Sequence, residues 1–559
     1  MKINYKILIY SFVLIFTVLF SFYPSLKNSF VNCDDNVLVT ENVSIKSFSL
    51  NNLKDIFTKP YCGLYHPLVQ VSYALEYKVF KLNPSGYHLT NLVFHLLNCL
   101  LVFWIFLLIS GNIVISFITA VLFGIHPMHV ESVAWISERK DVLYSIFFLG
   151  SIVAYLYYRT KNKAFYYIIS ISLFVLSLLS KVMAVSLPFA LIIFDYISER
   201  KDFKKIIYEK IPYFVLSILF AVIAFSIHYG SGEPNLAKSF ILNLKYALFG
   251  IVFYIYKMIY PVSICFGYPF KPEDFIGITF ISIFPAFAMG VITSIVLYSM
   301  KFTRKIFFGA LFFIITIFPV IQLVPSGQNI PWDRYTYIPF IGLFYIVAEG
   351  FNYFRKQRFK RIISDIVLIL MILILAFLTF QRTKTWKSSF SLWNSVLKVY
   401  PNTARALKGL GDAYKEQGDY KKALQEYSKA LESKPGYIDA LNNRGNLYSL
   451  LSDYANAEKD FNFGIKISQK NPGIYYNRGL IYEKTNRLYK AVSDYSNAIA
   501  LSPGNAEFYN NRGVVFARLN KYQLAINDFE GALKLNPQLT AARTNLEHAL
   551  KLITKNRNK

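Results

Sequence analysis

The pattern of hydrophobic and polar positions divides the chain into two unlike parts. Long apolar runs with short polar loops between them extend from Met1 to about Gln381, and a polar, periodic sequence follows to Lys559. A helix needs about 20 apolar residues to cross a bilayer. The first part therefore predicts a polytopic helical membrane domain, with twelve candidate runs at 5–23, 90–109, 111–125, 142–158, 164–180, 182–196, 211–228, 240–260, 278–299, 304–321, 337–351 and 363–381.

The first apolar run resembles the start of a signal peptide, because Lys2 and Lys6 precede it. No cleavage site of small residues follows the run at Phe22, and further spans follow. We therefore expect a retained first span.

Basic loops indicate the orientation, since Lys and Arg concentrate in cytoplasmic loops. Lys2 and Lys6 place the N-terminus inside, and the basic loops near 159–163, 200–210, 301–305 and 355–361 should lie inside as well. All of them fit only if the run 240–260 does not cross fully. Its Lys245 and Lys257 suit a re-entrant or interfacial helix.

We therefore predict eleven spans plus one non-spanning helix. This arrangement puts the polar C-terminal part outside the cytoplasm, on the same side as the segments 24–88, 126–141, 229–277 and 322–336. A full crossing by 240–260 would instead make the C-terminal part cytoplasmic.

The C-terminal part repeats itself every 34 residues. Gly411, Gly445, Gly479 and Gly513 keep this step, and so do the columns Ala423/Ala457/Ala491/Ala525, Tyr427/Phe461/Tyr495/Phe529 and Tyr414/Tyr448/Tyr482/Phe516. A period of 34 with these residue types resembles the tetratricopeptide repeat. We expect a solenoid of paired helices over 402–559, with a capping helix near 538–555 and a connecting helix within 382–401, after a membrane domain over 1–381.

Asn443, Asn477 and Asn511 recur at one position of the repeats. In the tetratricopeptide family such residues tend to line a concave groove and to bind an extended peptide backbone. The alternative, that they stabilise helix pairs, is equally open. Either way the array resembles a polypeptide-binding module.

The charge and the cysteines exclude some partners. The formal net charge is +27, but much of it lies in short loops between apolar runs, where it meets anionic lipid headgroups. We therefore expect membrane lipids, and no nucleic acid, as partners. Without a C-x-x-C pair no zinc or redox motif is expected, and Cys33 and Cys62 could form a disulfide or stay as two thiols.

Chemically reactive side chains gather in the predicted outer loops. Asp34 and Asp35 follow the first span, and one carboxylate could serve as general base toward an acceptor hydroxyl, although a solvated turn is the simpler interpretation. The segment 126–141 contains His126, His129 and Glu131, but without the H-E-x-x-H spacing of a zinc site. Its Arg139 and Lys140 could neutralise a phosphate.

The order of these motifs is more specific than any one of them. An acidic pair, Tyr-x-Pro-Leu, His-Pro-x-His-x-Glu, Arg-x-Asp and Asp-Arg-Tyr-Thr-Tyr-x-Pro are followed by a repeat array. This order resembles the transmembrane and tetratricopeptide-repeat-containing O-mannosyltransferases and their bacterial relatives, within the GT-C superfamily of polytopic glycosyltransferases.

The resemblance implies a polyprenyl-phosphate sugar as donor and a protein acceptor on the non-cytoplasmic side. It maps the catalytic carboxylate to Asp34 or Asp35 and implies an inverting displacement, with basic groups stabilising the leaving phosphate. The residues expected at the donor or substrate are His66, His126, His129, Glu131, Arg139, Asp141, Lys181, Asp333 and Arg334. Relatives commonly have Lys-Glu where this chain has Lys181-Val182, so we favour a reaction without a cofactor or metal.

Two other functions stay open. A non-enzymatic scaffold that displays the array would need only a few anchoring spans, and a transporter or flippase would need polar residues inside its spans. The sequence specifies neither the sugar nor the acceptor. The Lys-, Ile- and Asn-rich composition favours a bacterial plasma membrane over an endoplasmic reticulum membrane with a lumenal array.

Overall fold

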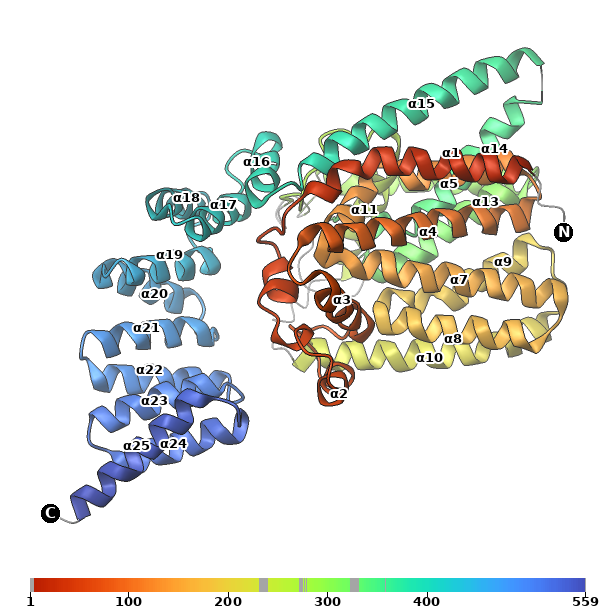
Figure 1. Cartoon of the computed structure of the whole chain (residues 1–559). Helices are drawn as coiled ribbons and strands as arrows, with labels where there is room; N and C mark the ends of the chain where they lie inside the picture. The colour runs from red at the N-terminus through yellow and green to blue at the C-terminus, as the bar shows by residue number, and fades with distance from the viewer. Residues whose placement is uncertain are drawn as a thin grey trace. The chain divides into compact units, whose positions relative to one another are not determined.

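The computed structural model describes residues 5–230, 240–270, 275, 277, 279–321, 331–356 and 358–557, which are largely helical (Figure 1). These residues contain no β-strand, only an isolated bridge between Tyr61 and Leu64. The chain divides into two compact units, Met1–Ser395 and Val396–Lys559, which we describe separately. The expected all-α class is confirmed, while parts of the predicted outer segments 229–277 and 322–336 lie outside the described residues.

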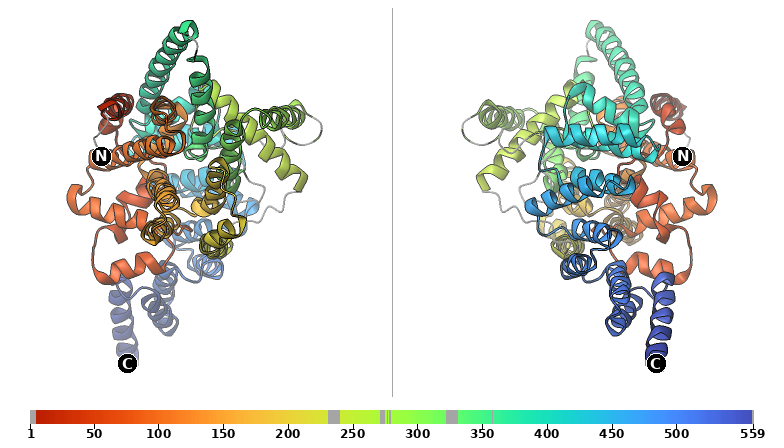
Figure 2. Two further views of the ribbon diagram at one scale, coloured as in Figure 1. Left: turned by 90° about the vertical axis from the view of Figure 1, so that its right-hand side faces the viewer. Right: turned by 90° about the vertical axis from the view of Figure 1, so that its left-hand side faces the viewer.

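All twelve apolar runs form helices in the first unit. They are α1 (Tyr5–Phe22), α4 (Pro84–Ser110), α5 (Ile113–Ile125), α7 (Arg139–Lys161), α8 (Ala164–Ser180), α9 (Leu187–Ile197), α10 (Phe203–Gly230), α11 (Phe240–Ile259), α12 (Phe280–Ser299), α13 (Arg304–Ile317), α14 (Phe340–Phe354) and α15 (Arg358–Lys384). Figure 2 shows the orange and yellow helices end-on in its left view, packed beside one another.

Local sequence explains where these helices begin and end. Pro84 stands in the first turn of α4, and the Asn83 side chain accepts the Ser85 N–H. Gly111 ends α4 in the left-handed conformation, with φ +60°. The Asn112 side chain then accepts two N–H groups at the start of α5. The tight turn between α4 and α5 is therefore encoded by two consecutive residues, Gly111 and Asn112.

Seven helices in the described part are by length and composition sufficient to cross a bilayer: α1, α4, α7, α10, α11, α12 and α15. An eighth results if α5 is counted with the bent segment Pro127–Ala134. The remaining apolar helices are shorter, and they complete the bundle through packing against their neighbours. Gly309 of α13 and Gly342 of α14 allow the closest of these approaches, because a Cβ on Gly309 would lie 2.4 Å from the Gly342 carbonyl oxygen.

Segments far apart in the sequence meet at one end of the bundle, here called the loop end: 23–83, 126–138, 260–270, 331–339 and 385–395. The Ser29 N–H donates to the Lys387 carbonyl at 3.0 Å, and the Trp135 indole donates to the Cys33 carbonyl at 2.8 Å. The Tyr268 hydroxyl donates to Asp333 at 2.8 Å. The described parts of the four predicted outer segments therefore share one face.

The basic loops meet at the opposite end. Arg159 pairs with Asp195 at 3.0 Å, and Arg304 pairs with Glu199 at 3.3 Å. Asn112 and Asn352 hydrogen-bond at 3.2 Å, which brings the α4–α5 turn to the end of α14. This grouping agrees with the predicted common side for these loops; its cytoplasmic location stays a prediction.

Helix α11 contacts the loop end near its C-terminal end, and near its start it contacts the connection that leads to α12. Near its start, the Lys245 ammonium donates to the Gly277 carbonyl at 2.8 Å. Near its end, the Met258 carbonyl lies 3.0 Å from His126 Nε2. By length and composition α11 is one of the seven helices sufficient to cross a bilayer, so the expected eleven spans plus one non-spanning helix stay a prediction.

The loop end has a folded interior of its own. The first loop contains η1 (Tyr23–Lys27), η2 (Asn36–Thr40), η3 (Val43–Ile45), α2 (Leu50–Thr58) and α3 (Pro67–Phe80). The second contains η4 (Pro127–His129), α6 (Val130–Ala134) and η5 (Ile136–Glu138), and the later turns are η6 (Val182–Ser186), η8 (Phe318–Val320) and η9 (Asp333–Thr336). A buried cluster that includes Val39, Val69, Tyr73 and Ile136 joins the first two loops.

The second unit is the expected helical array (Figure 1). Helix α16 (Ser389–Val399) leads into it, and its helices are α17 (Ala404–Glu416), α18 (Tyr420–Ser433), α19 (Ile438–Leu450), α20 (Tyr454–Ile467), α21 (Pro472–Lys484), α22 (Leu488–Leu501), α23 (Ala506–Arg518), α24 (Tyr522–Leu535) and α25 (Thr540–Arg557). The glycine column faces the aromatic column, because a Cβ on Gly445 would lie 2.7 Å from Phe461. The second, third and fourth repeats each contain a largely buried Arg–Asp pair, as between Arg478 and Asp494 at 2.7 Å.

Candidate active site

Asp35 anchors the first loop to the second. Its carboxylate accepts the Val31 and Ser137 N–H groups, both at 3.0 Å, and also the Ser137 hydroxyl. The side chain is 1% exposed. Burial raises the pKa of Asp35 to about 7, against the lowering effect of these donors. Asp35 therefore has a structural role, holding the two loops together, and an acceptor hydroxyl cannot reach it.

Asp34 has the opposite environment. It is exposed and adopts a left-handed conformation, with φ +64°, which is uncommon for residues other than glycine. Its neighbours are both fixed, since the Cys33 carbonyl accepts from Trp135 and Asp35 is buried. The strained turn thus presents the Asp34 carboxylate to solvent. Burial raises the pKa of the nearby Cys62 thiol, and the charge of Asp34 raises it further. Cys33 and Cys62 are not joined by a disulfide.

A buried carboxylate, Glu138, holds three cations at the loop end. Lys140 Nζ lies 3.0 Å from Glu138 Oε1, Arg334 Nε lies 3.3 Å from the same oxygen, and Lys181 Nζ lies 4.0 Å from Oε2. Arg334 also pairs with Glu131 at 2.6 Å, and Lys181 pairs with Asp141. The start of α7, the residue before η6 and η9 are distant in sequence, and each places a cation beside Glu138.

Lys140 and Arg334 are somewhat more exposed than Lys181, whose side chain is 9% exposed. The Lys140 side chain is 13% exposed and the Arg334 side chain is 14% exposed, whereas Glu138 and Glu131 are fully buried. Arg334 is further held by stacking over Trp332, with its guanidinium 4.1 Å from the ring centroid. Lys140 and Arg334 are therefore the cations that an anionic ligand can reach most readily.

Arg139, predicted as a phosphate ligand, is enclosed. Its guanidinium makes a bidentate pair with Glu76 at 2.7 and 2.9 Å, donates to the Tyr87 carbonyl at 2.9 Å and also contacts Asn91. The side chain is 0% exposed. Because a phosphate could reach it only after this pairing broke, Lys140 takes its place in our interpretation of the site.

The predicted histidines lie close to this cluster but inside the packing. His126 Nε2 lies 3.0 Å from the Met258 carbonyl, and His129 Nδ1 lies 2.8 Å from the Phe123 carbonyl. Both rings pack against Phe340 and Phe344. In the described ranges no three His, Cys, Asp or Glu side chains could hold a metal together. The metal-independent reaction stays a prediction.

Asp333 lies on the far side of Arg334. It accepts the Tyr268 hydroxyl at 2.8 Å, and Arg382 of the last apolar helix lies 3.8 Å away. Burial raises the pKa of Asp333 to about 6, while Arg382 lowers it. Asp333 therefore joins the α11–α12 connection to the end of α15.

Four of the five tryptophans surround Phe266 beside Arg334. Their ring centroids lie 5.2 Å (Trp135), 5.2 Å (Trp332), 5.4 Å (Trp386) and 5.5 Å (Trp393) from that of Phe266. This cluster joins the second loop, the segment before η9 and the segment that leaves α15.

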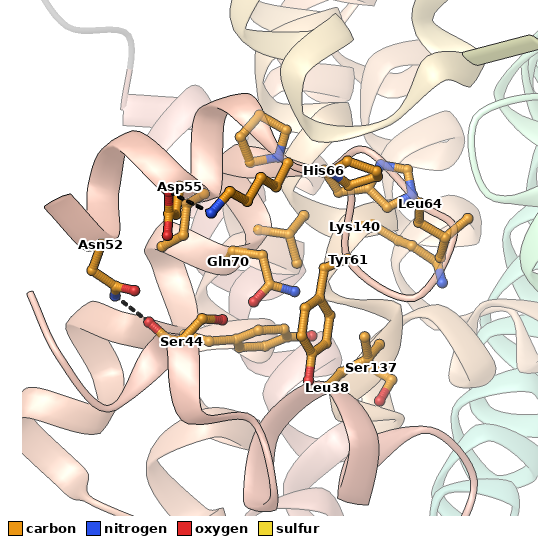
Figure 3. Close-up of a pocket in the computed structure, with 16 residues that line it drawn as sticks. Leu38, Ser44, Asn52, Asp55, Tyr61, Leu64, His66, Gln70, Ser137 and Lys140 are labelled. Atoms are coloured by element: carbon orange, nitrogen blue, oxygen red, sulfur yellow. Dashed lines mark hydrogen bonds and ion pairs between the residues drawn. The ribbon is translucent and has the colours of Figure 1, made fainter. Parts of the chain in front are cut away.

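A cavity of about 230 Å³ lies between the first loop and the Ser137–Lys140 segment (Figure 3). Its polar lining comes from α2, from the turn before α3 and from α3 itself, and includes His66 and Lys140. His66 Nδ1 is buried without a hydrogen-bond partner. Burial lowers the pKa of His66 to about 3, helped by the charges of Lys140 and Lys181. The ring is therefore neutral and can donate or accept a hydrogen bond.

In the array, the asparagine column bridges neighbouring repeats. The Asn443 amide donates to Asp412 at 2.7 Å, Asn477 to Asn442 at 2.8 Å, and Asn511 to the Tyr476 hydroxyl at 2.8 Å. Each amide thus has a donor engaged with the preceding repeat. This geometry favours the stabilising role over the peptide-binding one.

Sequence reasoning placed most of the cluster but missed two members. Asp34, Glu131, Asp141, Lys181 and Arg334 surround the same region as predicted. Neither Glu138, the centre of the ion pairs, nor Gln70 was among the predicted site residues. The signal for Glu138 was its position directly before Arg139 and Lys140; no local signal marked Gln70.

Comparisons with known proteins fit both units. Models described as "TPR repeat" match residues 411–452 and 484–520, and models described as "Tetratricopeptide repeat" match 438–471 and 506–539. "Protein O-mannosyl-transferase F38B6.6" of Caenorhabditis elegans is 26% identical over 360 residues, which cover 62% of this chain and 50% of that protein. The chain is similar to the protein O-mannosyl-transferases.

Human "Protein O-mannosyl-transferase TMTC3" is 22% identical over 400 residues, covering 63% of this chain and 43% of that protein. The resemblance indicated by the motif order is thus confirmed, and the chain aligns with half or less of the length of these relatives. Among solved structures, MamA matches 27% of this chain and 82% of its own with 21% identity and a TM-score of 0.26. The tetratricopeptide protein YrrB matches 36% and 97%, with 19% identity and a TM-score of 0.26.

Proposed function

We propose that this chain is a membrane glycosyltransferase that moves a hexose, mannose in the first instance, from a polyprenyl-phosphate donor to a protein hydroxyl. The observation that carries the proposal is the contrast between the two adjacent carboxylates. Asp35 is buried and holds the loop in place, whereas Asp34 is exposed to solvent and its charge acts on Cys62 and Lys140. An exposed carboxylate held by a strained turn suits a general base.

In the proposed reaction, Asp34 takes the proton of the acceptor hydroxyl, and the hydroxyl oxygen attacks the anomeric carbon. The bond from that carbon to the phosphate oxygen breaks, and the polyprenyl phosphate leaves with one more negative charge than the donor carried. Attack from the face opposite to the phosphate inverts the anomeric configuration. The residues must therefore stabilise charge that develops on the phosphate.

Lys140 and Arg334 are placed for that task. They are the more exposed cations of the ion cluster, and both form an ion pair with the buried carboxylate of Glu138. Positions fixed before the donor arrives reduce the reorganisation that the reaction requires. Lys181 and Asp141 form a further ion pair in the same cluster, and their opposite charges offset each other.

We further propose that the loop end faces the non-cytoplasmic side of a bacterial plasma membrane, with an endoplasmic reticulum lumen as the alternative. The support is the grouping of the basic loops at the opposite end, since Lys and Arg favour cytoplasmic loops. The chain leaves the first unit at the loop end, where the Ser29 N–H contacts the Lys387 carbonyl. A repeat array that begins there would meet protein acceptors on that side.

The test is transfer of radiolabelled mannose from a polyprenyl-phosphate donor to protein, with the full chain in membranes. Asp34→Asn should lower the rate by about 10²- to 10⁴-fold, the usual contribution of a general base. Glu41→Gln, an exposed carboxylate of the same loop, is the matched control and should leave the rate within twofold. Normal transfer by Asp34→Asn would show that Asp34 is not the base. No transfer from polyprenyl-phosphate mannose or glucose by folded wild type would favour the non-enzymatic scaffold.

A further inference from the structure

The cavity under the first loop has a lining with the chemistry of a carbohydrate site. Hydrogen-bonding side chains face it (Figure 3), and its lining includes two tyrosines, Tyr61 and Tyr73. The hydrogen-bonding side chains include Asn52, Asp55, Tyr61, His66, Gln70 and Lys140. A pyranose ring presents the complementary surface, because its hydroxyls both donate and accept hydrogen bonds and one face carries mainly C–H groups.

The size of the cavity selects a small ligand. Its volume is about 230 Å³, below the roughly 300–1,000 Å³ of pockets that hold drug-sized molecules. A single sugar ring fits such a volume, whereas an extended peptide or a polyprenyl chain does not. Val69 and Tyr73 contribute apolar surface to its lining and belong to the buried cluster that joins the first two loops.

Several polar groups of the wall are oriented before any ligand arrives. The Gln70 amide oxygen accepts from Asn42 at 2.8 Å, which leaves the amide NH₂ as a donor. The Tyr61 hydroxyl donates to the Val37 carbonyl at 2.9 Å and fixes the ring. His66 contributes a buried ring nitrogen that has no hydrogen-bond partner. Unsatisfied buried polar atoms are costly, and a ligand hydroxyl would satisfy this one.

The cavity also adjoins the groups of the proposed reaction. Lys140 lines it and pairs with Glu138 at 3.0 Å. Asp34 interacts electrostatically with Lys140 and with Cys62, which follows Tyr61 directly. A sugar in the cavity would therefore lie beside a phosphate held by Lys140.

We infer that this cavity holds the hexose ring of the donor, with its hydroxyls on Gln70 and His66, one ring face on Tyr61 and its phosphate toward Lys140. The inference rests on the proposed function, because it takes the donor to be a polyprenyl-phosphate hexose. Gln70 and Tyr61 then determine which hexose is accepted. Sites that hydrogen-bond a hydroxyl reject analogues that lack it, since the polar partner is left unpaired.

The experiment compares three lipids bound to the full chain in nanodiscs: farnesyl phosphate mannose, farnesyl phosphate glucose and farnesyl methyl phosphate, a sugar-free diester of the same charge. Wild type should bind at least one sugar lipid more tightly than farnesyl methyl phosphate. Gln70→Leu and Tyr61→Leu should each weaken that sugar lipid about five- to tenfold, the loss of one neutral hydrogen bond or ring contact, and leave farnesyl methyl phosphate within twofold. Lys78→Ala, at an exposed position of the same helix, is the matched control.

Equal affinity of wild type for all three lipids would overturn the inference. So would variants that weaken farnesyl methyl phosphate as much as the sugar lipid, because that result indicates a role in folding alone; thermal unfolding of each variant identifies this case. The two proposals fail separately. Sugar preference without transfer would refute the transfer reaction and keep the cavity, whereas transfer unaffected by both substitutions would refute the cavity and keep the reaction.

Discussion

The Ser137 N–H donates to the Asp35 carboxylate at 3.0 Å, although the two residues are 102 positions apart. This contact joins the loop after the first apolar helix to the turn before α7. The Val31 N–H donates to the other oxygen of the same carboxylate, also at 3.0 Å. Because Asp34 and Lys140 are the near neighbours of this pair in sequence, the relative position of the proposed base and the proposed phosphate ligand depends on it.

The pH dependence of stability should report on Asp35. Its pKa is raised to about 7 in the folded protein from 3.8, so the folded state keeps a proton between these values that the unfolded chain has released. The free energy of unfolding contributed by this group therefore falls as the pH rises from about 4 to about 7, and is constant above that. Asp35→Asn does not titrate. The difference in stability, wild type minus variant, should decline across this window in thermal unfolding experiments in detergent.

Glu41→Gln controls for a general change in charge of the same loop, and its difference from wild type should not follow that profile. A difference between wild type and Asp35→Asn that stayed constant from pH 4 to 7, or rose, would show that Asp35 is ionised in the folded protein throughout.

Adjacent residues of equal chemical type behave differently here, which limits what the sequence alone predicts. Asp34 and Asp35 are indistinguishable by residue type, and only the donors at Val31 and Ser137 decide which one is buried. Arg139 and Lys140 differ likewise, because successive residues of a helix point about 100° apart. Arg139 therefore meets Glu76, and Lys140 meets Glu138 and the cavity.

The periodic features, in contrast, were predicted well. Apolar runs and a 34-residue step are local properties that each segment carries by itself, so all twelve apolar helices and the array follow from the pattern. The asparagine column shows the limit again. Its position in the repeat was evident, but the partner of Asn477, which is Asn442 of the preceding repeat, depends on how the repeats stack.

Glu138 should act as a positioning residue for Lys140 and Arg334. Glu138→Gln keeps the shape but removes the charge, so two cations lose their common counter-ion and the site loses its fixed geometry. We expect kcat/KM for the polyprenyl-phosphate donor to fall about 10- to 100-fold, the loss of about 1.4 to 2.7 kcal/mol of transition-state stabilisation. Steady-state transfer kinetics at varied donor and acceptor concentrations measure this.

A structural role alone would lower the amount of folded protein and leave the pattern of KM and kcat unchanged. Glu138→Asp, which keeps the charge, should recover part of kcat/KM. If Gln and Asp variants were equally impaired, the carboxylate charge would not be what positions the cations.

The aromatic cluster should report on the integrity of the loop end. Phe266→Ala removes the ring that four tryptophans surround, and such core truncations cost about 3–5 kcal/mol. We expect the tryptophan emission to shift to longer wavelength and the transfer rate to fall, because Trp332 also carries the Arg334 guanidinium. Phe287→Ala is the control, since Phe287 is 69% exposed on α12. Unchanged emission in Phe266→Ala would show that the tryptophans pack without it.

The glycine column of the array should tolerate no side chain. A Cβ on Gly479 would lie 2.8 Å from the Tyr495 ring, closer than real Cβ contacts. Alanine would gain about 1 kcal/mol of helix propensity, but overpacking a core typically costs about 1–3 kcal/mol. Net destabilisation of the α21–α22 pair follows, because Tyr495 is fully buried and its hydroxyl donates to Glu483 at 2.9 Å.

Hydrogen exchange of peptides from α21 and α22 in the full chain should be faster in Gly479→Ala than in wild type. Gly504→Ala is the control, because its added Cβ meets nothing within 4 Å, and it should exchange as wild type does. Equal protection in both variants would mean that the ring shifts freely and that the column is not fixed by packing.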